Sequence, residues 1–384
     1  MKVISQRELE LPDAVIGKLL EIVVEDKSII SISAGEPDFL APKPIRDYTK
    51  RIVDKATHYG APQGNIELRE AICKKLKKDN KIKADPDNIL VTCGSQEAIF
   101  VAMLTSLDVA DQIIVPNPSY LVYVPAIELV NGVPIFLELK EEENWRIDVD
   151  KLRKLIDKKK THGIIVNTPS NPLGSVLDRK ILEEIADIAV ENDLYIFSDE
   201  AYEKLIYGKK HVSVGSLNGM EEYTITFQSF SKTYAMCGYR LGYAVGPKKL
   251  ISAMNKVSHY VTLSAPTISQ LVGIKALSIS NKYIEKMRME YDRRRRFIVK
   301  RLNEIGLVTK MPYGAFYTFS NIKNVTRKDS YKFAKELLNK CKVAVVPGTE
   351  FGKFGEGYIR CSYATELNKI KIAMDRIEKF VKKA

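Results

Sequence analysis

The stretch YTITFQSFSKTYAMCGYRLGYAVG, residues 223–246, indicates the fold class and contains an unusual lysine. Its two ends are short β-rich runs, and a polar segment with serines and glycines joins them. Lys232 lies in this segment between Ser229 and Arg240, away from the charged neighbours of most lysines in the chain. A lysine amine forms imines with carbonyl groups, and an arginine fork binds phosphate through two hydrogen bonds. We therefore expect Lys232 to react with a carbonyl group or to hold a phosphate.

Similar runs recur between about residues 65 and 280 and alternate with helical patterns. Most of them are continuously apolar, which is typical of strands that helices cover on both faces. This alternation predicts an α/β fold whose large domain has a mostly parallel sheet sandwiched by helices. The expected strands are 88–93, 112–117, 163–168, 194–199, 223–228 and 241–246.

Polar, turn-forming clusters follow several of these expected strands. In open α/β sheets, ligands bind at the carboxyl ends of the strands. We therefore expect the clusters to line one cleft. They are CGSQE, PNPSY, NTPSNPLG, SDEAY and QSFSK.

The pattern changes near residue 281, where a long charged helix precedes shorter strand-like and helical segments. These segments predict a smaller α+β domain over residues 283–384, beside a large domain over residues 46–282. The segment 1–45 is too short for a core of its own, so we expect it to join the small domain. A chain of 384 residues is long enough for such a division.

The charge of the chain is basic, with a net value of +12, but the basic residues are interleaved with acids. Anionic small molecules are therefore expected as partners, rather than nucleic acid. The densest run, RRRR at 293–296, is expected on a solvated helix surface, in ion pairs with Glu290 and Asp292. Four successive residues fan around a helix, so they cannot form one basic face.

Targeting and metal-binding signals are missing from the sequence. No apolar stretch reaches the roughly 18 residues of a membrane span, and the N-terminus lacks the apolar region of a signal peptide. We therefore expect a cytoplasmic protein with no membrane partner. The five cysteines are widely spaced and the four histidines form no helical pair, so neither disulfides nor a metal site are expected.

The polar clusters can be compared with the needs of pyridoxal phosphate, the most common cofactor that binds a lysine through an aldehyde. Its ring nitrogen needs a carboxylate and its phenolic oxygen needs hydrogen-bond donors. Asp199, at the end of an apolar run, is the candidate carboxylate, although a helix N-cap is an equally simple role. Tyr202, about one helical turn later, is the candidate donor, with core packing as its alternative.

The candidate phosphate cup is CGSQEAI at 93–99, where a strand, a glycine and a helix start follow one another. Ser95 and Gln96 would present backbone N–H groups at the positive end of that helix. Ser229 and Arg240 would complete the cup from the lysine segment. Strand–Gly–Ser–helix is a common pattern, so this signal is weak when taken alone.

Three more residues have both a simple and a functional interpretation. Asn171 lies between turn prolines and is either a turn residue or an amide donor to cofactor and substrate. Tyr120 either packs in the core or stacks on the cofactor ring. Arg360 lies in an apolar run and needs an anion, either a substrate carboxylate or a structural acid. Taken together, these residues follow strand ends in an order that serves one cofactor.

From residue 33 to residue 364 the chain resembles the class I aminotransferases, fold-type I enzymes that use pyridoxal phosphate. The likeness is greatest to the archaeal aromatic and aspartate aminotransferases. The segments that carry it are SAGEPDF, THYGAPQGNIELREAI, NTPSNPLG, SDEAYEKLIY, SFSKTYAMCGYRLGY, GAFY, VAVVPGTEFG and YIRCSYA. The resemblance implies that residues 46–282 form the domain that binds pyridoxal phosphate.

The resemblance also implies roles for individual residues. The catalytic ones are Lys232 in the Schiff base and in proton transfer, Asp199 at the ring nitrogen, and Tyr202 at the phenolic oxygen. The further cofactor contacts are Asn171 at the phenolic oxygen, Tyr120 over the ring, and Ser95, Gln96, Ser229 and Arg240 at the phosphate. The substrate carboxylate is assigned to Gly35, Asn171 and Arg360. Tyr59 resembles a tyrosine that reaches the phosphate of the other subunit, which implies a homodimer with shared active sites.

The expected activity is transfer of an amino group from an L-amino acid to 2-oxoglutarate by a ping-pong mechanism, with amino acids and 2-oxo acids as partners. Aromatic or broad-range donors are favoured over aspartate because two side-chain carboxylate partners of aspartate-specific relatives are missing. Ser95 stands where one branch has a lysine, and no arginine occurs between Arg240 and Arg288. An aspartate aminotransferase remains an alternative, and so does a C–S β-lyase of the same fold.

Three other classes are less compatible with the sequence. A regulator built on the same fold would need a DNA-binding domain, and the segment before residue 46 is expected to be too short for one. A nucleotide-dependent oxidoreductase would need a GxGxxG motif after its first strand, and none is present. Nucleic-acid binding has only the net charge in its favour, and a salt-dependent shift assay would test it.

Overall fold

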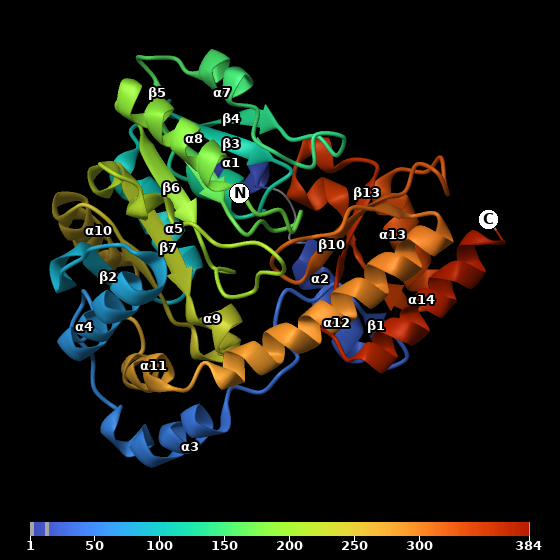
Figure 1. Cartoon of the computed structure of the whole chain (residues 1–384), viewed down its shortest axis with the longest axis horizontal. Coiled ribbons are helices and arrows are strands. Elements are labelled where there is room, and N and C mark those ends of the chain that lie inside the picture. Colours follow the sequence, from blue (N-terminus) through green and yellow to red (C-terminus); the bar gives the residue numbers. More distant parts are fainter. Residues whose placement is uncertain (1–3, 12–14, 384) are drawn as a thin grey trace.

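The fold is described by a computed structural model that covers residues 4–11 and 15–383 (Figure 1). The remaining positions of the predicted N-terminal segment, 1–3 and 12–14, and residue 384 lie outside the described residues. No helix in the described ranges is both long and apolar enough to cross a membrane.

The largest element is a seven-stranded sheet in which β8 alone runs antiparallel to its neighbours. This arrangement confirms the predicted mostly parallel sheet, and all six expected strands are present with small shifts at their ends. In spatial order the strands are β2 (Ile89–Thr92), β8 (Gly242–Val245), β7 (Thr224–Ser229), β6 (Tyr195–Asp199), β5 (Thr161–Asn167), β3 (Gln112–Asn117) and β4 (Val133–Glu138).

The strand β4 was not predicted. It forms one edge of the sheet and is only partly buried, and it contains Pro134. A proline cannot donate to a strand ladder and is tolerated mainly at edges. The partial burial and the proline therefore explain why the sequence signal for β4 was weak.

Helices cover both faces of this sheet, which explains the continuous apolar runs. In β3, Ile113 and Val115 pack into one cluster and Ile114, between them, packs into another. Successive side chains of a strand point to opposite faces, so a sheet buried on both sides needs apolar residues at every position. The first cluster includes α5 (Ser95–Ser106), α6 (Tyr123–Glu128) and α10 (Lys248–Val261), and the second includes α7 (Val149–Leu155) and α8 (Arg179–Glu191).

A third layer of helices packs beside β2 and β8. It is formed by α3 (Lys43–Ile52), α4 (Ile66–Lys75) and α11 (Thr267–Ser278). The short helix α9 (Phe230–Thr233) follows β7 directly and contains Lys232.

The C-terminal part has a separate four-stranded sheet, in which β10 and β13 are the central, antiparallel pair. The long helix α12 (Lys282–Ile305) runs from beside α9 and α11 into this part (Figure 1). The other elements here are β9 (Val308–Thr309), β10 (Tyr317–Asn321), α13 (Ser330–Cys341), β11 (Val343–Ala344), β12 (Val346–Pro347), β13 (Tyr358–Ser362) and α14 (Leu367–Val381).

The N-terminal segment contacts the C-terminal part through β1 (Ile30–Ser31), which pairs in parallel with β11. Ile32 also packs into the core formed by the C-terminal elements. The helices α1 (Gln6–Glu10) and α2 (Val15–Glu25) precede this strand. We keep the division at 1–45, 46–282 and 283–384 as a proposal, which the pairing of β1 supports.

The arginine run at 293–296 corrects one sequence expectation. Its ion pairs with Glu290 and Asp292 are present. However, Arg294 and Arg295 are buried rather than solvated. Both lie on the face of α12 that packs against the protein, where the aromatic rings and acids around them replace water.

Candidate active site

Lys232 lies on α9, directly after the carboxyl end of β7. The Ser229 side chain caps this helix by accepting a hydrogen bond from the Ser231 backbone N–H at 3.2 Å. The half-buried Lys232 amine donates to the Gly35 carbonyl oxygen at 2.6 Å, and the Phe316 ring centroid lies 6.0 Å from it. The fold thus brings together three segments that are far apart in the sequence.

Asp199 ends β6 and is buried. Its carboxylate accepts hydrogen bonds from the Tyr123 hydroxyl at 2.7 Å and from the Ala201 N–H at 3.1 Å. Burial raises the pKa of Asp199, and the nearby charge of Lys232 acts in the opposite direction. The chain after Asp199 forms turns in the described structure, so the alternative role as a helix N-cap is wrong.

Tyr202 and Tyr317 form a buried pair whose hydroxyl oxygens lie 2.8 Å apart. Burial raises the pKa of the Tyr202 hydroxyl well above its usual value, so this group keeps its proton. Tyr317 was not singled out from the sequence, although its segment GAFY was part of the resemblance. Its position on β10 gave no signal, because an aromatic residue at the start of a strand is ordinary.

Arg360 is buried on β13 and has no acidic partner among the described residues. Its guanidinium donates to the Asn171 amide oxygen at 3.0 Å and to the Ser33 carbonyl at 2.8 Å, while its buried Nε has no hydrogen-bond partner. A structural carboxylate was one alternative for Arg360, and the described part of the chain does not supply it. An arginine that lacks an anion in the interior is a candidate anion-binding group.

The residues of the predicted phosphate cup lie between β2, α5 and the lysine segment. Gly94 has φ of +86°, and a Cβ atom there would lie 2.8 Å from an Arg240 guanidinium nitrogen. A Cβ at Gly242 would lie 2.5 Å from the Ser95 backbone nitrogen. Glycine at both positions therefore allows the lysine segment to approach the start of α5 closely. Gln96, on the same helical turn, accepts from the Tyr120 hydroxyl at 3.4 Å.

Tyr59 is the one predicted site residue that the described chain does not bring into the cluster. Its side chain is 86% exposed, and it makes no hydrogen bond or ring contact with the other candidates in the ranges described. The prediction was that Tyr59 reaches the site of a second subunit, and a single chain does not test this.

A buried polar network lies next to Asp199 and was missed in the sequence. Glu200 accepts hydrogen bonds from Ser213 and pairs with His211 at 2.8 Å, while Glu203 pairs with Lys75. Asn80 and Gln228 donate to the same carboxylates. The network joins residues that are more than a hundred positions apart, so no local pattern could have revealed it.

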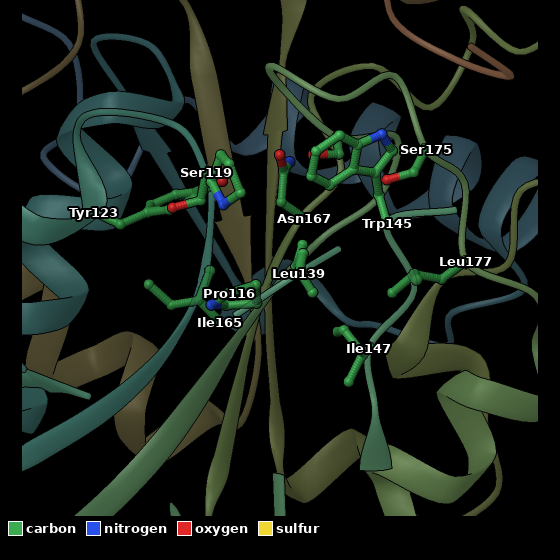
Figure 2. Close-up of a pocket in the computed structure, with 12 residues that line it drawn as sticks. Pro116, Ser119, Tyr123, Leu139, Trp145, Ile147, Ile165, Asn167, Ser175 and Leu177 are labelled. Atoms are coloured by element: carbon green, nitrogen blue, oxygen red, sulfur yellow. The ribbon is translucent and has the colours of Figure 1, made fainter. Parts of the chain in front are cut away.

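A small cavity of about 20 Å³ lies beside Tyr123 and Asn167. Figure 2 shows Tyr123 and Ser119 on one side of it and Trp145 on the other, with Asn167 between them. It is large enough for about one water molecule and much too small for a cofactor. We therefore place this cavity behind the candidate site rather than in it.

A lysine after one strand of a mostly parallel sheet, near a buried carboxylate on the next strand, defines a fold-type I enzyme that uses pyridoxal phosphate. A family model described as aminotransferase class I and II matches residues 27–377, so the chain belongs to this family. The protein is an aminotransferase that depends on pyridoxal phosphate.

Similar proteins include an aspartate aminotransferase of Pyrococcus abyssi, 47% identical, and an aromatic-amino-acid aminotransferase of Thermococcus litoralis, 45% identical. Each match covers 96% of this chain and 95% of the relative. The crystal structure of an aromatic aminotransferase from Pyrococcus horikoshii matches with a TM-score of 0.90 and 45% identity, over 96% of this chain and 99% of that one. An aspartate aminotransferase from Thermus thermophilus with maleate matches with a TM-score of 0.94 and 34% identity, over 99% of this chain and 100% of that one.

The residues present fit the cofactor. The absence of a Cβ at Gly94 lets the Arg240 guanidinium lie beside the start of α5, so that a positive charge and the backbone N–H groups of a helix start are close together, as a phosphate requires. The buried Asp199 suits a protonated ring nitrogen, because a positive partner offsets the cost of burying its charge.

Proposed function

We propose that this chain transfers amino groups from aromatic or a broad range of L-amino acids to 2-oxoglutarate. The observation that carries the proposal is the buried Arg360, whose guanidinium has no acidic partner in the described chain and lies near Asn171. An amino acid and a 2-oxo acid share a carboxylate next to the reacting carbon, and one arginine can bind it in both.

The proposed roles combine the contacts described above with the membership of the family. Lys232 holds the cofactor and Asp199 stabilises the positive charge of its ring nitrogen, while Tyr202 donates to its phenolic oxygen. We also propose Asn171 as a donor to that oxygen and Tyr120 as the cover of the ring. The proposed phosphate ligands are Ser95, Gln96, Ser229 and Arg240.

Pyridoxal phosphate supplies an aldehyde for the amino group and a ring that accepts the electrons released at the substrate α-carbon. Lys232 Nζ would take the proton that leaves this carbon and would deliver it to the cofactor carbon that carries the aldehyde, so that no proton is left over. Gly35 is suited to position this amine, because its carbonyl accepts from Nζ at 2.6 Å. Arg360 and Asn171 orient the α-carbon towards Lys232. The same residues serve the second half of a ping-pong cycle in reverse.

The preference for aromatic donors rests on what surrounds the proposed carboxylate site. The Tyr317 and Phe351 rings lie 4.3 and 4.8 Å from the Arg360 guanidinium. Ser95 offers no positive charge for a second carboxylate, and the sequence between Arg240 and Arg288 contains no arginine. A site without a partner for a buried charge discriminates strongly against it.

Aspartate as donor is the second candidate, because relatives that are 47% and 40% identical are named aspartate aminotransferases. Measuring kcat/KM for Phe, Tyr, Asp, Ala and 2-aminoadipate with 2-oxoglutarate separates the two. We expect Phe and Tyr to exceed Asp by at least about tenfold, which corresponds to 1.4 kcal/mol. A preference for Asp would overturn the aromatic assignment and leave the aminotransferase assignment intact.

The role of Lys232 can be tested separately. We expect Lys232→Ala to abolish transfer and to remove the visible absorption band of the loaded protein, because the covalent link to the cofactor is lost. The exposed Lys248, which pairs with Asp85, is the matched control, and Lys248→Ala should keep both. Transfer at the wild-type rate by Lys232→Ala would show that another residue does this chemistry.

We further propose that the enzyme is a homodimer in which Tyr59 contributes to the phosphate site of the other subunit. The exposure of Tyr59 and of other large apolar side chains, among them Tyr260, supports a surface that a second copy covers.

A further inference from the structure

Tyr317 lies where the proposed cofactor site and the proposed substrate-carboxylate site meet. It is buried at the start of β10, and its hydroxyl lies 2.8 Å from the Tyr202 hydroxyl. The Arg360 guanidinium carbon lies 4.3 Å from the centre of its ring. A Cβ built on Gly35 would be 3.1 Å from the Tyr317 oxygen, so this hydroxyl also borders the loop that accepts from Lys232.

The direction of the hydrogen bond between the two tyrosines follows from their proton count. Each hydroxyl has one proton, and Tyr202 needs its proton for the phenolic oxygen of the cofactor. Tyr317 must then be the donor within the pair. A hydroxyl that accepts a hydrogen bond becomes a stronger donor itself, because successive hydrogen bonds polarise one another.

The ring of Tyr317 has a different partner. Arg360 is buried and has no acidic partner in the described chain, so its environment must tolerate the guanidinium without neutralising it. An aromatic face attracts a guanidinium and leaves its N–H groups free in the plane. The ring of Tyr317 therefore holds the guanidinium while leaving it able to bind a carboxylate.

We propose that Tyr317 is a positioning residue with two separable functions: its hydroxyl donates to Tyr202 and directs the Tyr202 proton to the cofactor, and its ring orients Arg360 for the substrate carboxylate. The inference rests on the proposed roles of Tyr202 and Arg360. It implies that cofactor chemistry and carboxylate binding respond to different parts of one side chain.

The hydroxyl function is tested by the pH midpoint of the visible absorption band of the cofactor-loaded protein. A hydrogen bond donated to the phenolic oxygen stabilises negative charge there. The bound cofactor, which gives the absorption band, therefore loses its proton at lower pH. Tyr317→Phe should raise the midpoint by roughly half a pH unit, and Tyr202→Phe by about one unit. The double variant should match Tyr202→Phe, because Tyr317 acts through Tyr202. An unchanged midpoint in Tyr317→Phe, or full additivity in the double variant, would overturn this function.

The ring function is tested by measuring the affinity for 3-phenylpropionate, a carboxylate without an amino group. The same absorption band reports the binding. Tyr317→Phe keeps the ring and should bind it within about twofold of wild type, whereas Tyr317→Leu should bind about five- to tenfold more weakly. Phe351→Leu is the matched control. The Phe351 ring also lies near Arg360 but makes no ring contact with Tyr202, so its loss should leave the pH midpoint unchanged. Equal affinity in Tyr317→Phe and Tyr317→Leu would overturn this function, and a loss of cofactor from Tyr317→Phe would overturn both.

Failure of the proposed function has a different signature. If the wild-type protein shows no visible band that changes when an L-amino acid is added, the proposed function fails and the inference fails with it. If the wild-type band responds and the Tyr317 variants do not differ from wild type, only the inference fails.

Discussion

At the scale of single residues, Gly94 determines where the guanidinium of Arg240 can lie. This guanidinium donates to the Cys237 and Cys93 carbonyls at 3.0 and 3.4 Å. It also lies beside Gly94, where the side chain of any other residue would be. Any side chain at residue 94 would occupy the place of the guanidinium. The proposed phosphate cup therefore depends on the absence of one carbon atom as much as on the charge of Arg240.

We predict that Gly94→Ala weakens the affinity for pyridoxal phosphate by roughly tenfold, because the added Cβ displaces Arg240 and the positive φ is strained. Titration of the cofactor-free protein by absorbance measures this. Gly238, two residues before Arg240, has no heavy atom within 4 Å of an added Cβ, so Gly238→Ala should keep its affinity within about twofold. Equal affinities in the two variants would rule out Gly94 as part of the cup.

At the scale of elements, α12 anchors the loop that contacts Lys232. Arg294 on this helix donates to both carboxylate oxygens of Asp38 at 2.9 and 2.8 Å, and to Glu290 at 2.9 Å. Asp38 lies three residues after Gly35, whose carbonyl accepts from the lysine. The helix thus links the C-terminal part to the segment that contacts Lys232 through one largely buried ion pair.

We predict that Asp38→Asn lowers the free energy of unfolding by about 2 kcal/mol, because it weakens hydrogen bonds to a charged group that is only 7% exposed. Urea unfolding at saturating cofactor measures the change. The pair between Lys43 and Asp47 on α3 is the control, since both side chains are largely exposed and Asp47→Asn should leave the midpoint unchanged. Equal effects of the two substitutions would contradict the anchoring role of Asp38.

The network around Glu200 makes stability depend on pH. Burial by itself lowers the pKa of His211, but the charge of Glu200 and the hydrogen bond to it outweigh burial, and the net direction is upward. The other charged groups facing this histidine are Glu203 and Lys75, and the attraction of Lys75 helps to hold the pKa of Glu203 at about 2 despite burial. A raised histidine pKa gives stability that is complete below about pH 6.5 and is lost as pH rises through the folded-state value.

We therefore predict that His211→Asn lowers Tm more at pH 6 than at pH 8, because the charged form of the histidine is the one that Glu200 stabilises. Thermal unfolding of both proteins, monitored by circular dichroism at pH 6 and pH 8, shows at which pH the loss of Tm is larger. A larger loss at pH 8 than at pH 6 would mean that the neutral histidine is the stabilised form.

At the scale of the whole molecule, the site is divided between parts of the chain that fold around different cores. Lys232 and Asp199 come from the large sheet, while Arg360 comes from the C-terminal sheet. The long helix α12 passes between these parts. A movement of one sheet relative to the other would change the distance between the proposed carboxylate site and the lysine.

We predict that the protein has twice the 43.4 kDa mass of one chain in solution, and that Tyr59→Phe weakens cofactor affinity by about fivefold without changing this mass. Light scattering gives the mass and absorbance titration gives the affinity. Tyr260→Phe is the control for loss of an exposed tyrosine hydroxyl. The shared site would be refuted if the protein is a monomer in solution and if Tyr59→Phe binds the cofactor as tightly as the wild type.

Much of the large sheet could be predicted from the sequence, since a strand covered on both faces needs apolar residues at every position. The run at 112–117 became β3 with its predicted limits, whereas the edge strand β4 lacked such a signal. The candidate residues at strand ends could also be named, because parallel strands bring their carboxyl ends to one edge of the sheet. Only the structure shows that β6, which ends at Asp199, is the direct neighbour of β7, which precedes Lys232.

The sequence by itself thus determined most of the large sheet and named Lys232 and Asp199 as candidates, because local periodicity and strand ends are properties of short segments. Only the tertiary structure decided which groups support them. The pairing of Tyr317 with Tyr202, the ion pair of Arg294 with Asp38 and the ion pair of Lys75 with Glu203 all join distant segments. Contacts of this kind depend on how the layers pack, and packing is a property of the whole chain.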